Sequence, residues 1–410
     1  MENKEILFAP FREMKDAFIH PLKPDGSLVH YFCGNSLGLQ PISTRGAIEE
    51  VLEDWGSLAV GGHFKAKRRW YDYPKLLNNG LARLCGALPT EVQAMGSLSG
   101  NLHLMLVSFF RPEGRRKKIL MEAGAFPSDQ YAVESQLRFH GLDPEKDLIE
   151  VRPREGEFCL QTEDILRQIE ENANDLALVL FSGVHYLSGQ AFDMQAISRA
   201  ARNAGARVGF DLAHAIGNIP LKLHEWQADF AVWCSYKYLN AGPGAVGGIF
   251  VHDCHAADSS LPRFAGWFGH DESRRFLMEK GFRPEYGAPG WQLSNENILS
   301  LAAIRASLAE FDKVSLDLLE KRREYLNGRM QKIIDRFEAL ETLTPAERGA
   351  QISVRIRNGS IRPLFEHLHS AGIVGDLREP DIMRLAVAAL YTSDEDLDAL
   401  ERGLHDFFSA

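Results

Sequence analysis

Long hydrophobic runs are missing from this 410-residue sequence, and so are paired cysteines and an excess of basic charge. The longest apolar runs, LALVLF at 176–181 and LAVAAL at 385–390, are too short to span a bilayer. The N-terminal string MENKEILFAPFREMKD is charged from its second residue and has no apolar core, so it does not read as a signal peptide. These features predict a cytoplasmic location and no membrane partner.

The cysteine and charge content excludes further classes. The five cysteines are odd in number and form no CxxC pair, which argues against a disulfide framework and fits a reducing compartment: Cys33, Cys85, Cys159, Cys234 and Cys254. The string HDCH at 252–255 places neighbouring side chains in alternating directions, and no further ligands follow at useful spacing, so we expect a surface turn and no metal. A net charge of −10 argues against a nucleic-acid partner.

The pattern along the chain alternates short apolar strands with amphipathic helices. The segments KKILMEAGAF, ALVLFSGVHY, ARVGFDLAH, ADFAVWCS and GGIFVHD are typical of buried strands, and helices are expected at about 43–60, 71–86, 99–110, 128–140, 162–172 and 193–204. This alternation predicts an α/β fold with a mostly parallel sheet covered on both faces.

The C-terminal part predicts a second, smaller unit. Residues 295–340 are strongly helical with a break near Val314 and Ser315, and a compact α/β pattern follows. We therefore divide the chain into an N-terminal arm (1–42) that belongs to the small domain, a large domain (43–295), and a linking helix with the small C-terminal domain (296–410).

Two residues predict the chemistry. Asp211 closes the apolar run VGF, and Lys237 follows 26 residues later in WCSYKYLNAGPG, among aromatic and small residues. A carboxylate beside a pyridinium nitrogen and a lysine that forms an imine are what pyridoxal 5'-phosphate (PLP) requires of a protein. Taken alone, Asp211 could simply cap a helix and Lys237 could be a surface residue.

Glycine-rich and helix-start motifs give weaker signals. Residues 242–247 satisfy GxGxxG, but the strand GIFV follows where a dinucleotide fingerprint needs a helix. In GSLSGNLHLML, Leu98 and Ser99 lie at the mouth of an expected helix, where backbone N–H groups can hold a phosphate. FPSD at 126–129 follows a strand and could place an aromatic face against a ring, or could be a plain helix start.

Taken together, long strings resemble the kynureninase family. They are YFCGNSLGLQP (31–41), NLHLMLVSFF (101–110), EAGAFPSDQYAVESQLRFHG (122–141), LFSGVHYLSGQ (180–190), GFDLAHAIGN (209–218), WCSYKYLNAGPG (233–244), GWFGH (266–270) and WQLSNENIL (291–299). The resemblance implies the PLP-dependent transferase fold of type I. Its large domain has a mostly parallel sheet of seven strands, and a smaller α/β domain lies at the C-terminus.

The same resemblance implies roles in binding the cofactor. Lys237 would form the imine, Asp211 would face the pyridine nitrogen, and Tyr236 would act with them in catalysis. The other cofactor positions that it implies are Leu98, Ser99, Phe126, Pro127, Ser128, Asp129, Ser182, His214, Trp267 and Asn295, the last two near a subunit boundary of a homodimer.

The implied reaction is hydrolysis of L-kynurenine, or its 3-hydroxy form, to the corresponding anthranilate and L-alanine. Arg384 would bind the substrate carboxylate, although LAVAAL replaces the proline-containing string usual in the family, and Asn35 and Ser36 would assist. His63, Ser294 and Asn295 would line the aromatic end, and polar groups there favour the 3-hydroxylated substrate or acceptance of both. His63 could equally be a structural surface residue.

Two other functions stay open from the sequence. One is another reaction on the same fold, cysteine desulfuration or transamination, although none of the cysteines lies in a recognisable glycine-rich catalytic loop. The other is a regulator that binds PLP and has lost catalysis, against which the intact Lys237, Asp211 and Arg384 argue.

Overall fold

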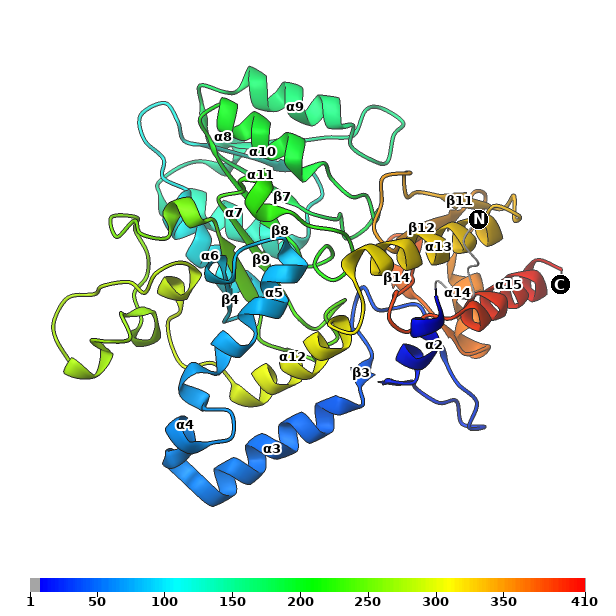
Figure 1. The fold of residues 1–410 in the computed structure, drawn as a ribbon. Coiled ribbons are helices and arrows are strands. Elements are labelled where there is room, and N and C mark those ends of the chain that lie inside the picture. The colour runs from blue at the N-terminus through cyan, green and yellow to red at the C-terminus, as the bar shows by residue number, and fades with distance from the viewer. Residues whose placement is uncertain (1–7, 410) are drawn as a thin grey trace.

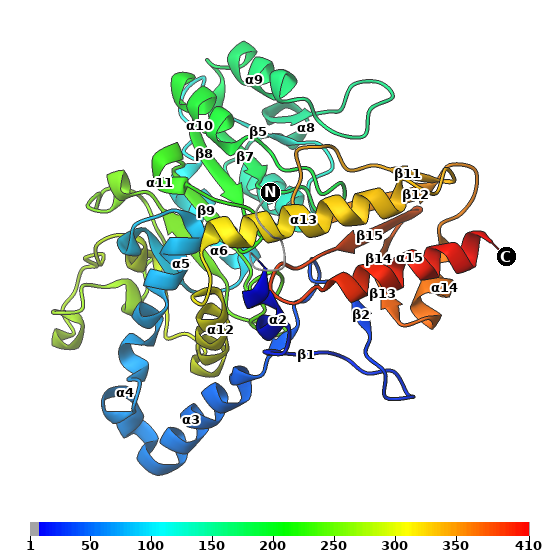
Figure 2. The ribbon, with the colours of Figure 1, turned by 45° about the vertical axis from the view of Figure 1, so that its right-hand side comes forward.

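The computed structural model describes residues 8–409. The first seven residues of the predicted arm and the last residue of the predicted small domain lie outside this range. Within it, two sheets are joined by long helices (Figures 1 and 2). No helix within residues 8–409 is both long and apolar enough to cross a membrane.

The larger sheet has seven strands in the order β4-β10-β9-β8-β7-β5-β6. Strands β5 to β9 run parallel, whereas β10 is antiparallel to both of its neighbours. The strands are β4 (Val92–Ala94), β5 (Lys118–Glu122), β6 (Leu148–Val151), β7 (Leu176–Ser182), β8 (Arg207–Asp211), β9 (Phe230–Trp233) and β10 (Gly248–Val251). The sequence did not predict β4 and β6, which are short and, in β6, only partly buried.

Apolar side chains on both faces explain why this sheet is covered twice. In β7, Leu178 and Leu180 belong to one apolar cluster and Val179 and Phe181 to another, because successive side chains of a strand point to opposite faces. The helices of this part are α6 (Leu98–Phe109), α7 (Pro127–Phe139), α8 (Pro144–Asp147), α9 (Thr162–Glu171), α10 (Met194–Asn203) and α11 (Leu223–Trp226). Leu102 and Met105 of α6 pack on one face, and Ile197 of α10 packs on the other.

The N-terminal segments connect both parts of the molecule. They are α2 (Ala9–Lys15), β1 (Phe18–Ile19), β2 (His30–Tyr31), β3 (Gln40–Pro41), α3 (Ser43–Leu58), η1 (Ala59–Gly61), α4 (Gly62–Lys65), η2 (Trp70–Leu76), α5 (Asn78–Cys85) and η3 (Pro89–Glu91). The continuous helix expected at 71–86 is wrong: a 3₁₀ segment, η2, precedes α5, because Asp72 has non-helical dihedral angles and Pro74 lies inside the segment. The predicted helix at 43–60 is confirmed as α3.

The smaller sheet is antiparallel, in the order β11-β12-β15-β14. The elements of this part of the chain are α13 (Leu316–Ile334), β11 (Leu340–Thr342), β12 (Gln351–Ile356), α14 (Arg362–Ser370), β13 (Ile373–Val374), β14 (Asp376–Arg378), β15 (Ile382–Ala386) and α15 (Asp394–Phe408), and β13 lies outside the four-stranded sheet. A separate apolar cluster, with Leu326, Ile352 and Leu400 at its centre, holds this part together. β2 of the N-terminal segment pairs with β13. The boundaries at 42/43 and 295/296 stay a prediction.

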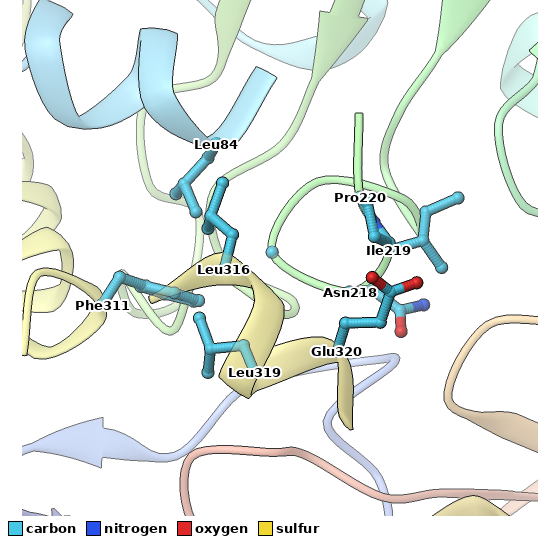
Figure 3. Close-up of a pocket in the computed structure, with 9 residues that line it drawn as sticks. Leu84, Asn218, Ile219, Pro220, Phe311, Leu316, Leu319 and Glu320 are labelled. Atoms are coloured by element: carbon cyan, nitrogen blue, oxygen red, sulfur yellow. The ribbon is translucent and has the colours of Figure 1, made fainter. Parts of the chain in front are cut away.

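A pair of helices leads from one part to the other. Helix α12 (Ile298–Phe311) lies along α3, and α13 extends from the large sheet across the small one (Figure 2). The helical break predicted near Val314 and Ser315 is confirmed, since Ser315 caps α13 by accepting a hydrogen bond from the N–H of Leu318 at 3.1 Å. Apolar side chains from α5, α12 and α13 meet beside the loop that follows β8 (Figure 3): Leu84, Phe311, Leu316 and Leu319.

The segment between β10 and α12 has little regular structure. It contains the short turns η4 (Asp253–His255), η5 (Trp267–Gly269), η6 (Arg275–Leu277) and η7 (Ala288–Trp291). Trp291 is buried and its indole N–H donates to the hydroxyl of Ser108 at 2.9 Å, which anchors the end of this segment to α6.

Candidate active site

A cavity of about 150 Å³ opens where strand ends meet helix starts. Ser182 and Asp211 are the last residues of β7 and β8, and Leu98 is the first residue of α6. Carboxyl ends of parallel strands and N-termini of helices are where α/β proteins bind phosphorylated ligands. The lining residues are Leu98, Ser99, Phe126, Ser128, Asp129, Ser182, Val184, Tyr186, Asp211, Ala213, His214, Tyr236 and Lys237.

The amine of Lys237 lies against a buried imidazole. Its Nζ is 3.0 Å from Nε2 of His214, and it lies 5.8 Å from the ring centre of Phe126 and 6.0 Å from that of Tyr236. Burial, reinforced by the charge of Lys237, holds the pKa of His214 well below its usual value, so this imidazole is neutral at physiological pH. The Nε2 atom of this neutral imidazole can accept a hydrogen bond from the amine of Lys237, which holds the amine in the cavity.

Two carboxyl groups share the floor of the cavity. Asp211 accepts a hydrogen bond from the backbone N–H of Ala213 at 2.6 Å, and Asp129 lies beside it. Burial raises the pKa of Asp129 well above its usual value, and the charge of Asp211 raises it further. Burial raises the pKa of Asp211 as well, but the hydrogen bonds that it accepts from Asp129 and from the N–H of Ala213 oppose this shift, so Asp129 is the carboxyl group that keeps the proton.

A third buried carboxyl group supports the floor from below. Oε1 of Glu122 accepts hydrogen bonds from the hydroxyl of Ser182 at 2.6 Å and from its backbone N–H at 3.0 Å. Its Oε2 is buried and has no hydrogen-bond partner within residues 8–409. Burial raises the pKa of Glu122 to about 7.

The first turn of α6 supplies donors for an anion. Ser97 caps this 12-residue helix by accepting a hydrogen bond from the N–H of Gly100 at 3.4 Å, and Leu98 and Ser99 occupy the first two helical positions. The N–H groups of a first turn have no partner inside the helix, and the helix dipole favours a negative charge there.

These groups fit PLP. The cavity holds donors for a phosphate in the first turn of α6, an aromatic face in Phe126, a carboxylate in Asp211 and the amine of Lys237. Nδ1 of His214 is a buried polar atom with no hydrogen-bond partner among the described residues. Because His214 lines the same cavity, a bound polar ligand would account for this unpaired atom.

Comparison with known proteins places the chain in a family. Residues 315–404 match the sequence model of the kynureninase C-terminal domain. A kynureninase of Xanthomonas euvesicatoria pv. vesicatoria is 53% identical over 395 residues, covering 95% of this chain and 93% of that protein. A kynureninase of Stenotrophomonas maltophilia is 51% identical over 389 residues, covering 93% and 92%. The chain belongs to the kynureninase family.

Solved structures of other proteins share the fold of this kynureninase-family chain. A cysteine desulfurase from Escherichia coli has a TM-score of 0.79 at 14% identity, covering 97% of this chain and 98% of that one. The cystine C–S lyase C-DES, with glycine covalently linked to its PLP cofactor, has a TM-score of 0.77 at 17% identity, covering 92% and 96%. At such identities the likeness concerns the fold alone, and it confirms the predicted fold class.

Arg384 lies behind the cavity of this kynureninase-family chain, outside its lining. Its side chain is 1% exposed, and Nη1 donates to the carbonyl of Tyr186 at 2.6 Å. Nη2 forms an ion pair with Asp376, which also accepts a hydrogen bond from the hydroxyl of Ser36 at 2.6 Å. Asn35, also predicted to bind substrate, is fully buried and donates to Oε1 of Gln351 at 2.8 Å.

Four predicted site residues lie away from the cavity of this protomer. His63 of α4 packs edge-on against Trp70, with ring centres 5.5 Å apart. Trp267 is 42% exposed and its indole N–H donates to the carbonyl of Arg275 at 3.2 Å, while Ser294 and Asn295 are exposed in the loop before α12. Pro127, the first residue of α7, is not among the lining residues either.

Three lining residues were missed by the sequence reasoning. Val184 and Tyr186 follow the last residue of β7, and Ala213 follows Asp211 by two positions. Their place just beyond strand ends was a usable signal, because ligands of α/β proteins bind there. Tyr186 packs edge-on against Phe126, with ring centres 5.2 Å apart, so it fixes the aromatic wall of the cavity.

Side chains far apart in the sequence accompany the HDCH string, which sequence spacing did not indicate. The fold brings Glu91 and His224 to His252, and one ligand-type atom from each lies within 4.8 Å of the others. Glu91 accepts hydrogen bonds from His224 at 2.8 Å and from the N–H of Asp253 at 2.7 Å, and His252 accepts from the N–H of Cys254 at 3.1 Å. These hydrogen bonds hold η4 against η3, so they give the cluster a structural role.

Proposed function

We propose that this protein binds PLP in the cavity around Lys237 and hydrolyses L-kynurenine to anthranilate and L-alanine. The observation that carries the proposal is the meeting of the Lys237 amine, the Asp211 carboxylate and the first turn of α6 in one cavity. Identity above 50% to kynureninases over nearly the whole chain supports it.

Different residues of the cavity would bind different parts of the cofactor. The N–H groups of Leu98 and Ser99 would hold the phosphate, and Phe126 would cover the ring. Asp211 would accept a hydrogen bond from the ring nitrogen and keep it protonated, while Lys237 would hold the cofactor covalently. Pro127, Ser128, Asp129, Ser182, His214 and Tyr236 complete the proposed set.

Bound PLP would draw electrons from the α-carbon of the amino acid, which is the chemistry that cleavage of its Cβ–Cγ bond requires. Lys237, freed by the substrate amine, would move a proton at the α-carbon. Tyr236 would donate or accept a proton as water adds at the γ-carbonyl and the bond breaks. The balance is one L-kynurenine and one water to one anthranilate and one L-alanine.

Arg384 would bind the α-carboxylate of the substrate, with Asn35 and Ser36 beside it. Arg384 is rigidly held by the carbonyl of Tyr186, a residue that also lines the cavity. A guanidinium held in one plane suits a carboxylate, because two parallel hydrogen bonds can form.

We also propose that the site is completed by a second copy of the chain. Trp267, Ser294 and Asn295 are exposed and His63 is half-buried, so these side chains can approach a partner's cavity. An exposed aromatic patch surrounds Trp267: Phe276 lies 5.3 Å from it, and Phe64 contacts Phe276 at 6.2 Å, ring centre to ring centre. Exposed apolar patches mark protein interfaces, and a symmetric homodimer would cover this one.

Preference between the two substrates would be decided at the aromatic end. His63, Ser294 and Asn295 supply polar atoms that could pair with a 3-hydroxyl group, so we propose a preference for 3-hydroxy-L-kynurenine or acceptance of both.

The five cysteines are free thiols, which supports a cytoplasmic location.

The test is product fluorescence from the PLP-loaded protein given L-kynurenine or its 3-hydroxy analogue. We expect the corresponding anthranilate, and we expect Lys237→Ala to lose both turnover and the visible absorbance of bound cofactor. Lys222→Ala, which removes an exposed lysine, should keep both. Normal turnover in Lys237→Ala would refute the assignment.

The same assay separates the alternatives. Release of alanine from cysteine, with neither anthranilate formed, would indicate a desulfurase, although none of the five cysteines lines the cavity as described. A yellow protein with no turnover of any amino acid would indicate a PLP-binding regulator.

A further inference from the structure

A cluster of charged side chains lies behind Arg384, on the face of the small sheet that meets the cavity wall. Strands β14 and β15 lie side by side (Figure 2). Asp376 and Arg378 are two residues apart in β14, so their side chains share a face, and Asp376 lies opposite Arg384 of β15 in the strand register. The carboxylate of Asp376 therefore lies between two guanidinium groups. Arg378 donates to its Oδ2 at 3.0 Å, and Arg384 forms an ion pair with the same oxygen.

Some N–H groups of Arg384 have no hydrogen-bond acceptor. Nη1 donates to Tyr186, and Nη2 donates to Asp376 and lies 3.4 Å from the hydroxyl of Ser36. Nε is buried and has no hydrogen-bond partner within the described chain. A guanidinium has five N–H groups, and a buried donor without an acceptor is costly. The unused donors are suited to the carboxylate of an incoming ligand.

The cluster holds one negative and two positive charges. Although burial raises the pKa of Asp376, the charge of Arg384 and the hydrogen bond from Ser36 outweigh it, and the pKa lies below its usual value. The nearby thiol of Cys33 is neutral, since burial raises its pKa to about 11. His214 is neutral as well. The cluster therefore carries a net single positive charge when no ligand is bound.

We propose that Arg378 is a positioning residue for recognition of the substrate α-carboxylate. It does not touch the substrate: by sharing the carboxylate of Asp376 with Arg384, it leaves the guanidinium of Arg384 with positive charge for the substrate. The inference rests on the proposed function, in which Arg384 meets that carboxylate.

Without Arg378, Asp376 would neutralise Arg384 alone. An incoming carboxylate would then meet an ion pair with no net charge, and the negative charge of Asp376 would repel it in a low-dielectric setting. An oxygen of Asp376, with the carbonyl of Tyr186, also fixes the plane of the Arg384 guanidinium, and asparagine at position 376 would keep an acceptor oxygen there. The two charges of β14 thus set both the orientation and the available charge of one arginine.

The first experiment measures binding separately from turnover. The PLP-loaded protein is titrated with L-alanine and with ethylamine, its analogue without a carboxylate, and the visible absorbance reports binding. We expect Arg378→Met to weaken L-alanine binding about tenfold and to leave ethylamine binding unchanged. Arg378→Lys should bind L-alanine nearly as the wild type does. Arg355→Met, on the same sheet and paired with Glu341, is the control and should change neither.

The decisive variant is the double substitution Arg378→Met with Asp376→Asn. It returns the cluster to a net single positive charge, so it should bind L-alanine more tightly than Arg378→Met alone. If Arg378→Met weakened the binding of L-alanine and ethylamine equally, or if the double variant bound L-alanine more weakly than Arg378→Met, the proposal would be overturned and a structural role for Arg378 indicated.

Turnover distinguishes this inference from the proposed function. With L-kynurenine, Arg378→Met should raise KM about tenfold and change kcat less than threefold. If the wild type hydrolyses no kynurenine, the proposed function fails, while the titration with L-alanine still decides the role of Arg378.

Discussion

Three buried carboxyl groups meet around the cavity, at the ends of β5 and β8 and in the first turn of α7. Burial raises the pKa of Glu122, Asp129 and Asp211, and the charge of Asp211 raises those of Glu122 and Asp129 further, so the three groups are not all charged at once. A protonated pyridine nitrogen would place a cation beside Asp211 and favour its charged form. The cluster therefore favours a cationic ring over a neutral one.

At this scale we predict a pH-dependent effect of Glu122→Gln on stability. The pKa of Glu122 is about 7 when folded and near 4.5 when unfolded, so the folded protein holds a proton that the unfolded chain releases between these values. Wild-type stability should thus fall as pH rises from about 4.5 to 7, by on the order of 3 kcal/mol. Glutamine keeps the acceptor for Ser182 and has no charge, so the variant should melt higher than wild type at pH 8.

The measurement is the thermal midpoint of both proteins at pH 5 and pH 8. At pH 5 the wild-type carboxyl is protonated in the folded state, and the advantage of the variant should nearly vanish. Glu163→Gln, an exposed change on α9, should show no advantage at either pH. An equal advantage for Glu122→Gln at both pH values would contradict the assignment of a proton to Glu122.

At the scale of elements, the site is built from the C-terminal ends of strands and the N-terminal ends of helices. β7 and β8 end at Ser182 and Asp211, and α6 and α7 begin at Leu98 and Pro127. Parallel strands all end at one edge of the sheet, and the helices on either face begin near that edge, so residues far apart in sequence converge. The donors of α6 and the carboxylate of β8 are therefore positioned by the same topology.

We predict that Leu98→Pro weakens PLP binding without disrupting α6. Position 98 follows the cap residue Ser97, whose dihedral angles are extended, and proline is tolerated at the first position of a helix. The substitution removes one N–H group, and loss of a hydrogen bond to a charged phosphate should raise the Kd for PLP about tenfold. Circular dichroism should be unchanged.

The control for this prediction is Leu98→Ala, which loses the same apolar side chain and keeps the N–H group. Binding of pyridoxal, which lacks the phosphate, should be equal in both variants. If Leu98→Ala weakens PLP binding as much as Leu98→Pro, the backbone donor at this position does not hold the phosphate.

At the scale of the whole molecule, several predicted site residues lie outside the cavity. His63, Trp267 and Asn295 come from segments that project from the large sheet, and none of them lines the cavity of its own protomer. A symmetric dimer would bring the same surface of each copy to the other. In the proposed dimer, each copy would supply residues to its partner's cavity.

We predict complementation between two inactive variants. Lys237→Ala and Asn295→Ala would damage opposite contributions to a shared site, so a mixed dimer would have one site with both defects and one intact site. Random mixing of the two proteins should restore about a quarter of the wild-type activity per site. Turnover of the mixture against each variant alone is the measurement.

Mixing Lys237→Ala with Asp211→Ala provides the control, because both residues line one cavity of the same protomer and no intact site can form. Recovery in that control, or no recovery with Asn295→Ala, would contradict the shared site.

Local sequence determined the elements and the chemistry of the site. Helix α3 follows its apolar spacing, and α13 and α15 also begin at the cap residues Ser315 and Ser393, signals that act over a few positions. Lys237 and Asp211 could be predicted because their neighbours in sequence already mark strand ends and small-residue turns, and the resemblance supplied His214 and most of the remaining lining. The break of the helix expected at 71–86 escaped this reasoning, although Pro74 marked it.

Only the tertiary structure decided which distant groups share charge and protons. The ion pair of Arg384 with Asp376, the hydrogen bonds of Ser182 to Glu122 and the meeting of Glu91 with His252 join residues from different strands and loops. Burial and proximity set pKa values and free donors, and both depend on how the two sheets and their helices pack. The sequence alone determined what chemistry is present, and the packing decided which of these groups carry charge and which remain available to a ligand.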